Sequence, residues 1–273
     1  MKRGALALLF TVAVVGCPTA AATRTVAAPP PTAESPASLV VALALGDPGL
    51  QAGVVRGGDV ILARGFEVEL ARLLARRLGA RVDRFVYVPS TTRLLAATAT
   101  GWQLGLAGID PSRGGAAGAA FSAPYLTTDV AVVTRRGLDA PRRLADLRPL
   151  ALCALRGGDA ARTAATVVRP KRPTVLATGD VRLLAMVQTG SCDAALVPAV
   201  QVGRFVEGHR RVIGSVAVRI RRGEGLVAVV PSAGGLDVQA VNRELGRLRR
   251  DGTLSRLART WLRLDPAGLR VLR

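Results

Sequence analysis

The side chains that most often carry out chemistry are rare in this sequence of 273 residues. It contains one histidine, His209, and three cysteines, Cys17, Cys153 and Cys192. A single histidine disfavours a histidine-based triad and a multi-histidine metal site. The sequence also has no Walker loop, no Gly-x-Ser-x-Gly elbow, no Cys-x-x-Cys pair and no His-Glu-x-x-His helix. We therefore expect no metal and no cofactor, and these absences argue against the common catalytic classes.

Cys17 has the sequence context for a covalent modification. Lys2 and Arg3 precede an apolar run over residues 5–15, which is typical of a secretory signal and too short to span a bilayer stably. Residues 14–17, Val-Val-Gly-Cys, resemble a bacterial lipobox, in which the cysteine thiol carries the diacylglycerol. We expect residues 1–16 to be a lipoprotein signal peptide and Cys17 to be acylated. An ordinary signal peptide with an incidental cysteine is the alternative.

Residues 17–37 are predicted to be a disordered tether. Pro, Ala, Thr and Ser dominate this segment, and it has no apolar periodicity. Such a tether would let a folded body reach away from a lipid anchor. We therefore expect an extracytoplasmic protein, anchored by lipid to the outer face of the cytoplasmic membrane.

The formal charge of +19 and a pI near 11.6 raise nucleic acid as a partner, but the residue pattern argues against it. The basic residues are almost all arginines spread along the chain, because lysine occurs only at Lys2 and Lys171. Nine aromatic residues cannot build a platform on which single-stranded bases stack. We expect no nucleic-acid partner, and a solvated basic surface that would favour an anionic cell surface or membrane face.

Strand and helix patterns alternate along the rest of the chain. The clearest helix is expected at 65–79, where Phe66 and four leucines line one face and Gly79 ends the helix. Glu67 and Glu69 are interpreted as carboxylates that favour its N-terminal dipole. Strands are also predicted at 38–45, 82–88, 104–108, 131–134, 150–154, 194–197 and 226–230, and helices at 92–100, 159–168, 180–188, 198–206, 237–250 and 254–264. This alternation predicts an α/β fold with mostly parallel sheets.

Five motifs over about residues 39–264 carry a resemblance to a known family. Residues 65–71, Gly-Phe-Glu-Val-Glu-Leu-Ala, are similar to a helix start of the family 3 extracellular solute-binding proteins, which are receptors of polar amino-acid ABC importers. The other similar segments are Leu-Ala-Gly at 106–108 with Phe-Ser-Ala-Pro-Tyr at 121–125, Leu-Ala-Asp-Leu at 144–147, residues 189–195, and residues 241–262.

The resemblance implies a two-lobed fold like that of the periplasmic binding proteins, with mixed, mostly parallel sheets joined by a two-strand hinge. Lobe 1 would comprise 39–132 plus 229–273, and lobe 2 would comprise 135–226, with crossover strands near 130–135 and 225–230. The implied function is non-catalytic capture of a small polar solute in a cleft that closes because both lobes contact the ligand in only one state. The implied partners are the solute and ABC permease subunits, and we expect a monomer.

The sequence departs from this family at the ligand site. Its amino-acid receptors usually hold the ligand α-carboxylate with an arginine seven residues after the glycine that is here Gly108, and that position is Gly115. Arg113 could take this role through a rearranged loop. The usual α-ammonium partner lies five residues after Asp193, where this chain has Pro198, which offers neither charge nor N–H. A desolvated zwitterion needs a charged partner at each end, so we expect that the solute is not an ordinary α-amino acid.

Polar residues at the implied cleft remain as candidates for the ligand site. They are Asp47, Ser90, Asp110, Ser112, Arg113, Arg156, Gly158 and Asp159. The two aspartates Asp47 and Asp110 would favour a cationic or polyhydroxylated ligand. The alternative for each candidate is a loop residue that caps a turn or a helix.

The resemblance also places Cys153 and Cys192 on neighbouring strands of lobe 2, which implies a disulfide, and two separate buried thiols are the alternative. Two other functions stay open. One is a sensor or interaction lipoprotein on the same fold whose cleft has decayed. The other is an enzyme of the cyclohexadienyl or arogenate dehydratase type, which a few family members are and which would also need a carboxylate-binding arginine and an acid in the cleft.

Overall fold

The computed structural model describes residues 37–96, 101–115, 118–207, 213–214, 218–221 and 223–273. Tertiary contacts divide the chain into Met1–Thr32 and Ala33–Arg273, and every described residue belongs to the second unit. The predicted signal peptide, Cys17 and His209 therefore lie outside the described residues, as does the predicted tether except for Ala37.

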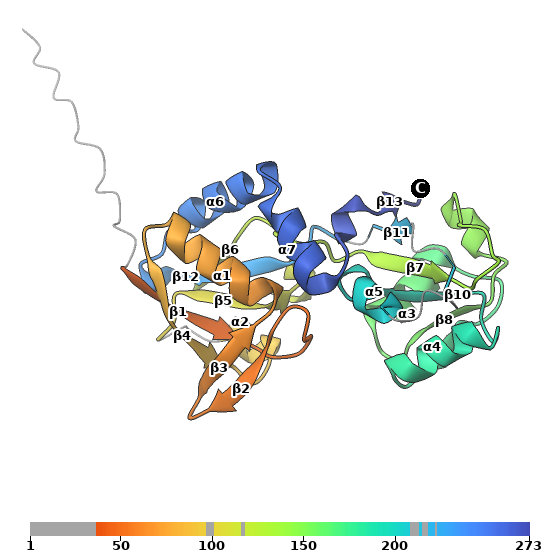
Figure 1. The fold of residues 1–273 in the computed structure, drawn as a ribbon, viewed down its shortest axis with the longest axis horizontal. Helices are drawn as coiled ribbons and strands as arrows, with labels where there is room; N and C mark the ends of the chain where they lie inside the picture. The colour runs from red at the N-terminus through yellow and green to blue at the C-terminus, as the bar shows by residue number, and fades with distance from the viewer. Residues whose placement is uncertain (1–36, 97–100, 116–117, 208–212, 215–217, 222) are drawn as a thin grey trace, which may run out of the picture. The chain divides into compact units, whose positions relative to one another are not determined.

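The first of two sheets has seven strands in the order β2-β3-β4-β1-β5-β12-β6 (Figure 1). These strands are β1 (Ser38–Leu43), β2 (Ala52–Arg56), β3 (Asp59–Arg64), β4 (Arg81–Tyr87), β5 (Leu104–Ile109), β6 (Ala119–Phe121) and β12 (Val227–Pro231). Strands β4, β1 and β5 are parallel, so their carboxyl ends meet at one edge of the sheet. The strands β12 and β6 continue the sheet antiparallel, and the β2–β3 hairpin forms the opposite edge.

Four helices complete the first lobe, and they are α1 (Phe66–Arg77), α2 (Thr91–Ala96), α6 (Val238–Arg250) and α7 (Thr253–Leu262). Helix α1 is amphipathic, because Phe66, Leu70 and Leu74 recur at intervals of four and are fully buried. It begins after Gly65, whose φ of 126° and whose approach to the carbonyl of Leu50 leave no room for a Cβ. The helices α1, α6 and α7 share one hydrophobic core with the sheet, whereas Leu94 of α2 belongs to a separate core.

The second sheet has six strands in the order β13-β11-β7-β10-β8-β9. These strands are β7 (Val130–Thr134), β8 (Leu152–Leu155), β9 (Val175–Ala177), β10 (Ala194–Pro198), β11 (Val218–Ile220) and β13 (Arg270–Val271). Strands β9, β8 and β10 are parallel, and β7 runs antiparallel to β10 and β11. The helices are α3 (Asp159–Thr163), which continues as a π-helical turn over Ala164–Val168, α4 (Asp180–Gln188) and α5 (Ala199–Val206).

The mixed α/β architecture with two sheets confirms the fold class predicted from the sequence. The predicted helix at 180–188 coincides with α4, and the predicted strand at 226–230 differs from β12 by one residue at each end. The sequence did not predict the β2–β3 hairpin or the short strands β6, β9, β11 and β13. These strands are two to six residues long, so their hydrophobic alternation is too brief to stand out.

Three segments cross between the two sheets rather than the two that were expected. Two of them meet at an isolated antiparallel bridge between Leu126 and Leu226. The third leaves α7, passes the 3₁₀ turn Pro266–Gly268 and enters β13, which pairs with β11 of the second sheet. The sequence prediction had placed all of 229–273 in lobe 1, but Leu269 and Leu272 bury their side chains in the two cores of the second lobe.

The guanidinium of Arg219 holds the third crossing segment in place. Arg219 forms an ion pair with Asp129, which directly precedes β7, and its Nε donates to the carbonyl of Leu269 at 3.0 Å. The side chain of Asp129 is 2% exposed and that of Arg219 is 13% exposed. Burial lowers the pKa of the Arg219 guanidinium from its ordinary value. The C-terminal segment is therefore tied both by strand pairing and by a largely desolvated charge.

Cys153 and Cys192 form a disulfide with an Sγ–Sγ distance of 2.06 Å. Cys153 lies in β8, and Cys192 lies in the turn that leads into the neighbouring β10. Both residues are fully buried in the core between the sheet and the helices α4 and α5. The bond closes a loop of 39 residues, which restricts the unfolded chain.

We expect that replacing both residues by alanine lowers the free energy of unfolding by about 2–4 kcal/mol, which corresponds to about 4–16 °C in Tm. The measurement is thermal unfolding with and without a reductant, in a chain whose Cys17 is Ala. Reductant should lower the Tm of the parent and leave the Cys153→Ala, Cys192→Ala variant unchanged. Two free thiols titrated in denatured, unreduced parent protein would contradict the pairing.

Candidate functional site

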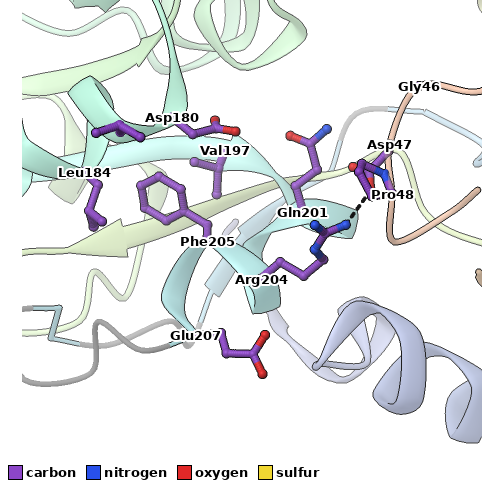
Figure 2. A pocket seen from close by; sticks show the side chains of 11 residues that line it. Gly46, Asp47, Pro48, Asp180, Leu184, Val197, Gln201, Arg204, Phe205 and Glu207 are labelled. Carbon is purple, nitrogen blue, oxygen red and sulfur yellow. Dashed lines mark hydrogen bonds and ion pairs between the residues drawn. The ribbon is translucent and has the colours of Figure 1, made fainter. Parts of the chain in front are cut away.

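A hollow of about 540 Å³ lies between a loop of the first lobe and two helices of the second (Figure 2). It is lined by Gly46, Asp47, Pro48, Asp180, Val181, Leu184, Val197, Gln201, Arg204, Phe205 and Glu207. The first three residues follow β1, and the others belong to α4, the end of β10, and α5 with the residue that follows it. The loop after the parallel strand β1 meets the N-terminus of α4 here, and α/β folds commonly bind ligands at such places.

Asp47 is fixed by the turn that it begins. Its Oδ1 accepts a hydrogen bond from the backbone N–H of Gly49 at 2.7 Å, and its carbonyl accepts from the N–H groups of Leu50 and Gln51. Across the hollow, Arg204 Nη1 lies 3.5 Å from the same Oδ1, as the dashed line in Figure 2 marks. The ion pair joins the loop after β1 to α5, so it links the two lobes directly.

The charges around the hollow are mainly negative. Of its three carboxylates, Asp47 pairs with Arg204 and Glu207 pairs with Arg263 at 3.2 Å. The third, Asp180, is exposed at the first position of α4 and has no ion-pair partner among the described residues. A cationic group that enters the hollow would therefore find a free carboxylate.

The hollow has an apolar side and a polar side. Figure 2 shows Leu184, Val197 and Phe205 gathered together, with Gln201 and Arg204 facing Asp47. Helix α5 is held in place by Gly203, because a Cβ there would meet the carbonyl of Leu262 in α7 at 2.1 Å. The arrangement can hold a small solute with a charged or hydrogen-bonding end and a short apolar part.

Asp47 is the one predicted site residue that lines this hollow. The other predicted residues of the first lobe follow β4 and β5 and act as caps. The Oγ of Ser90 accepts from the N–H of Arg93, and Oδ1 of the buried Asp110 accepts from the N–H of Ser112 at 3.0 Å. Ser112 is exposed, and the side chain of Arg113 lies outside the described part of the chain.

The predicted residues of the second lobe surround the turn after β8. Arg156 is exposed, Gly158 precedes α3, and Asp159 Oδ1 lies 3.0 Å from Arg162 Nη2 one turn along that helix. The structure therefore places the predicted residues at the carboxyl ends of parallel strands in both lobes. Asp47 bonds to Gly49 and Arg204, and it contacts none of the other predicted site residues by a hydrogen bond or ion pair.

The residues that the sequence reasoning missed are Asp180, Gln201, Arg204, Phe205 and Glu207. The position of Asp180 could have indicated a site residue, because it begins a predicted helix and so lies where a strand–helix connection would reach the cleft. The connection was not recognised, because β9 has only three residues and was not predicted. The others lie on or next to a helix whose sequence pattern indicated packing only.

Glu67 holds together three segments next to the candidate site. It is fully buried, and its Oε1 accepts from the N–H of Gly108 at 2.9 Å and from the hydroxyl of Tyr125. Its Oε2 accepts from Nε2 of Gln51, which also donates to the carbonyl of Leu106 at 2.7 Å. Gln51 ends the Asp47 turn and Gly108 precedes Asp110, so one carboxylate positions both loops. The interpretation of Glu67 as a helix-dipole residue missed this role.

Burial shifts the acid–base behaviour of this network. The loss of solvation raises the pKa of Glu67, although the hydrogen bonds from Tyr125, Gln51 and Gly108 act in the opposite direction. Burial and the neighbouring Glu67 carboxylate raise the pKa of Tyr125 well above its ordinary value, so the phenol keeps its proton. Tyr125 also stacks on Phe66, with ring centroids 6.1 Å apart.

Two α/β lobes that are joined by crossing segments and share a hollow define the class of two-lobed solute-binding proteins. Comparison with known families shows which family of solute-binding proteins the chain matches. Residues 62–264 match the family model of the bacterial extracellular solute-binding proteins, family 3. The chain belongs to this family, which confirms the resemblance seen in the sequence and makes the protein an extracytoplasmic solute-binding protein.

Solved structures show the same fold at low sequence identity. The unliganded L-cystine solute receptor of Neisseria gonorrhoeae is 18% identical, with a TM-score of 0.68 over 85% of this chain and 95% of that one. The second substrate-binding domain of GlnP from Lactococcus lactis is 14% identical, with a TM-score of 0.67 over 84% and 97%. An ancestral cyclohexadienyl dehydratase is 21% identical, with a TM-score of 0.61 over 84% and 93%. No curated protein matches this chain significantly in sequence.

The described residues carry neither a metal-binding cluster nor a membrane-spanning helix. They contain no group of three or more His, Cys, Asp or Glu side chains placed to hold a metal ion. No helix in the described part of the chain has the length and apolar character needed to cross a membrane.

We expect the Glu67 carboxylate to lower stability as the pH rises. Its pKa is higher in the folded than in the unfolded chain, so the folded chain binds more protons in the window between the two values. The free energy of unfolding of the parent minus that of Glu67→Gln should therefore fall as the pH rises above about 4.5, the ordinary value for a glutamate. Urea unfolding at several pH values measures this difference.

The matched control is Glu69→Gln, on the same helix, because Glu69 is partly exposed and pairs with Arg72. That change should move stability by about 0.5 kcal/mol or less. Glu67→Gln should cost about 1–3 kcal/mol, since its new Nε2 would face Nε2 of Gln51. A parent-minus-variant difference that rises with pH would contradict the shifted pKa.

Proposed function

We propose that this chain is a lipid-anchored solute-binding protein that captures a small polar solute outside the cytoplasm and delivers it to the permease of an ABC importer. The observation that carries the proposal is the hollow in which Asp47 of the first lobe meets Arg204 of the second. A solute bound there would contact both lobes at once, so it would stabilise one arrangement of the lobes. The proposed protein acts as a monomer and has no catalytic step.

The residues at the family's ligand positions support a solute other than an ordinary α-amino acid. Gly115 is exposed and has no side chain with which to hold a carboxylate. Pro198 ends β10 opposite Val130 and brings neither a charge nor an N–H to the cleft. The free carboxylate of Asp180 and the acidic lining favour a cationic or polyhydroxylated solute instead. The other predicted residues, from Ser90 to Asp159, are proposed to border the same cleft.

The anchor is proposed from the N-terminal sequence. The lipobox-like residues 14–17 and the Pro-, Ala- and Thr-rich segment that follows support a lipid on Cys17 and a flexible link to the folded body. A single acylated cysteine with two or three chains would hold the protein at the outer face of the cytoplasmic membrane.

Two other functions remain as alternatives. A sensor or interaction lipoprotein with a decayed cleft would bind no solute and would show no ligand-induced stabilisation. A dehydratase is favoured only by the likeness to ancestral cyclohexadienyl dehydratases, and it would form product from prephenate. Three carboxylates against one arginine line the hollow, which does not suit a dicarboxylate substrate, and this disfavours the enzyme.

We expect a thermal-shift screen of cationic and polyhydroxylated solutes to find a ligand that stabilises the protein. At a concentration about 100 times Kd, the stabilisation should reach about 2.7 kcal/mol. Asp180→Asn should weaken binding of that solute about 10- to 100-fold, because it removes a charged hydrogen-bond acceptor.

The control is Asp139→Asn, which changes an exposed aspartate after β7 and should leave binding unchanged. Calorimetric titration with each standard amino acid should give no micromolar affinity. A micromolar Kd for a standard amino acid would overturn the proposed ligand class. No stabilisation by any solute would favour the decayed cleft, and turnover of prephenate would favour the dehydratase.

We also expect Cys17→Ala to move the protein from the membrane fraction to the soluble fraction. The parent should incorporate labelled palmitate, and the variant should incorporate none, because the thiol that carries the lipid is gone. Cys153→Ala with Cys192→Ala is the control and should keep the label. Equal labelling of the parent and Cys17→Ala would show that the lipid is attached elsewhere.

A further inference from the structure

The β2–β3 hairpin exposes large aliphatic side chains. Val54, Val55, Ile61 and Leu62 have 52%, 44%, 39% and 73% of their surface exposed. Val54 and Ile61 lie directly opposite each other in the hairpin, so their side chains share one face. The other exposed large aliphatic side chains in the described part of the chain, Val167, Val175 and Val181, belong to three different elements. Val55 lies opposite Val60 and therefore on the other face, so the hairpin leaves apolar surface in water on both of its faces.

Leu62 is unfavourable in two ways. Its φ is 53°, in the left-handed region that leucine rarely adopts, where the ladder between β2 and β3 has an irregularity. The positive φ does not bury the leucine side chain, because Leu62 is the most exposed of the four residues. A conformation that is strained and also exposes a leucine suggests a contact outside the chain.

A basic groove lies beside the hairpin, because β3 and β4 pair only at Asp59 and Val86. The groove has a volume of about 620 Å³ and contains four arginines, Arg72, Arg76, Arg81 and Arg84, against two aspartates, Asp59 and Asp83. Arg72 pairs with Glu69, and Arg84 lies 3.8 Å from Asp59. Arg76 and Arg81 are exposed and have no carboxylate partner among the described residues.

We propose that this hairpin surface, formed by Val54, Ile61 and Leu62 with Arg76, Arg81 and Arg84 of the neighbouring groove, docks on the anionic face of a lipid bilayer. The aliphatic side chains offer no hydrogen bonds of their own and suit the boundary between headgroups and acyl chains. The guanidinium groups suit lipid phosphates, which they can bind with two donors each. The chain carries a formal charge of +19, or +17 without Lys2 and Arg3 of the predicted signal peptide, so an anionic surface would also attract it from a distance.

The geometry of the surface favours a bilayer over a nucleic acid. One aromatic ring, Phe85, lines the groove, and the guanidinium of Arg72 covers it with a distance of 5.4 Å to the ring centroid. Stacking on bases is therefore not available there. The hairpin is also at the edge of its sheet, so no other strand in the described part of the chain covers β2.

The test is sedimentation of the full chain, with Cys17→Ala to prevent acylation, with vesicles of pure phosphatidylcholine or with about 30 mol% phosphatidylglycerol. The chain should bind the anionic vesicles and lose most of this binding in about 0.5 M salt. Arg76→Gln with Arg81→Gln should weaken binding about fivefold for each arginine removed. Arg172→Gln with Arg182→Gln makes the same change in net charge in the second lobe, outside the groove, and should have a much smaller effect.

A matched pair of valines tests the aliphatic part of the surface. Val54→Thr on the edge strand β2 should weaken vesicle binding about two- to fourfold. Val175→Thr on β9, the edge strand of the other sheet and exposed to 46%, should leave it unchanged. Leu62→Asn should weaken binding and keep or raise Tm, because asparagine tolerates a positive φ. This variant separates docking from folding.

Three results would overturn the proposal. Equal binding to neutral and anionic vesicles would remove the role of the arginines. Equal losses in the matched variants would show that only the total charge or total apolar surface matters. A dimer that light scattering detects without lipid, and that Val54→Thr dissociates, would show that a second copy of the chain covers the hairpin.

Discussion

A buried carboxylate sets the local arrangement of the first lobe. Glu67 is removed from water near the start of α1, and such a charge is tolerated only where donors surround it. Gln51, Gly108 and Tyr125 supply these donors, and they come from the loop after β1, the end of β5 and the crossing segment. Each of these segments must reach Glu67, so their positions are coupled. The loops that border the candidate site thus share one buried support.

The two lobes are coupled at their surface by weaker contacts. The pair between Asp47 and Arg204 is partly exposed, so it stabilises one arrangement by about 1 kcal/mol or less. A bound solute can therefore compete with it at little cost. By contrast, the contact of Gly203 with Leu262 is close and steric, and it fixes where α5 lies on α7. This combination of one fixed contact and one weak contact suits a protein whose lobes move about a hinge.

The sequence predicted those parts of the fold that depend on long periodic patterns. The helices at 65–79 and 180–188 have an apolar face several turns long, and β7 and β12 are continuous buried runs. Glu67 could not be interpreted correctly from the sequence, because a carboxylate in a first helical turn favours the dipole whether it is buried or exposed. The hollow was missed for a similar reason, since Arg204 and Phe205 come close to Asp47 only through tertiary packing. Asp47 was predicted because it lies in the loop after the first strand, at the cleft that the family resemblance implies.

The C-terminal crossing has a consequence for how the second lobe can be separated. This lobe is assembled from an internal stretch and the last residues of the chain, since β13 covers the edge of β11 and Leu272 fills one of its cores. The carbonyl of the final residue, Arg273, even accepts a hydrogen bond from the N–H of Leu144. Any continuous fragment that contains the whole second lobe therefore also contains β12, α6 and α7 of the first. An isolated version would need the tail spliced onto the internal stretch, and a fusion partner added at the C-terminus would emerge directly from the packed surface beside Leu144.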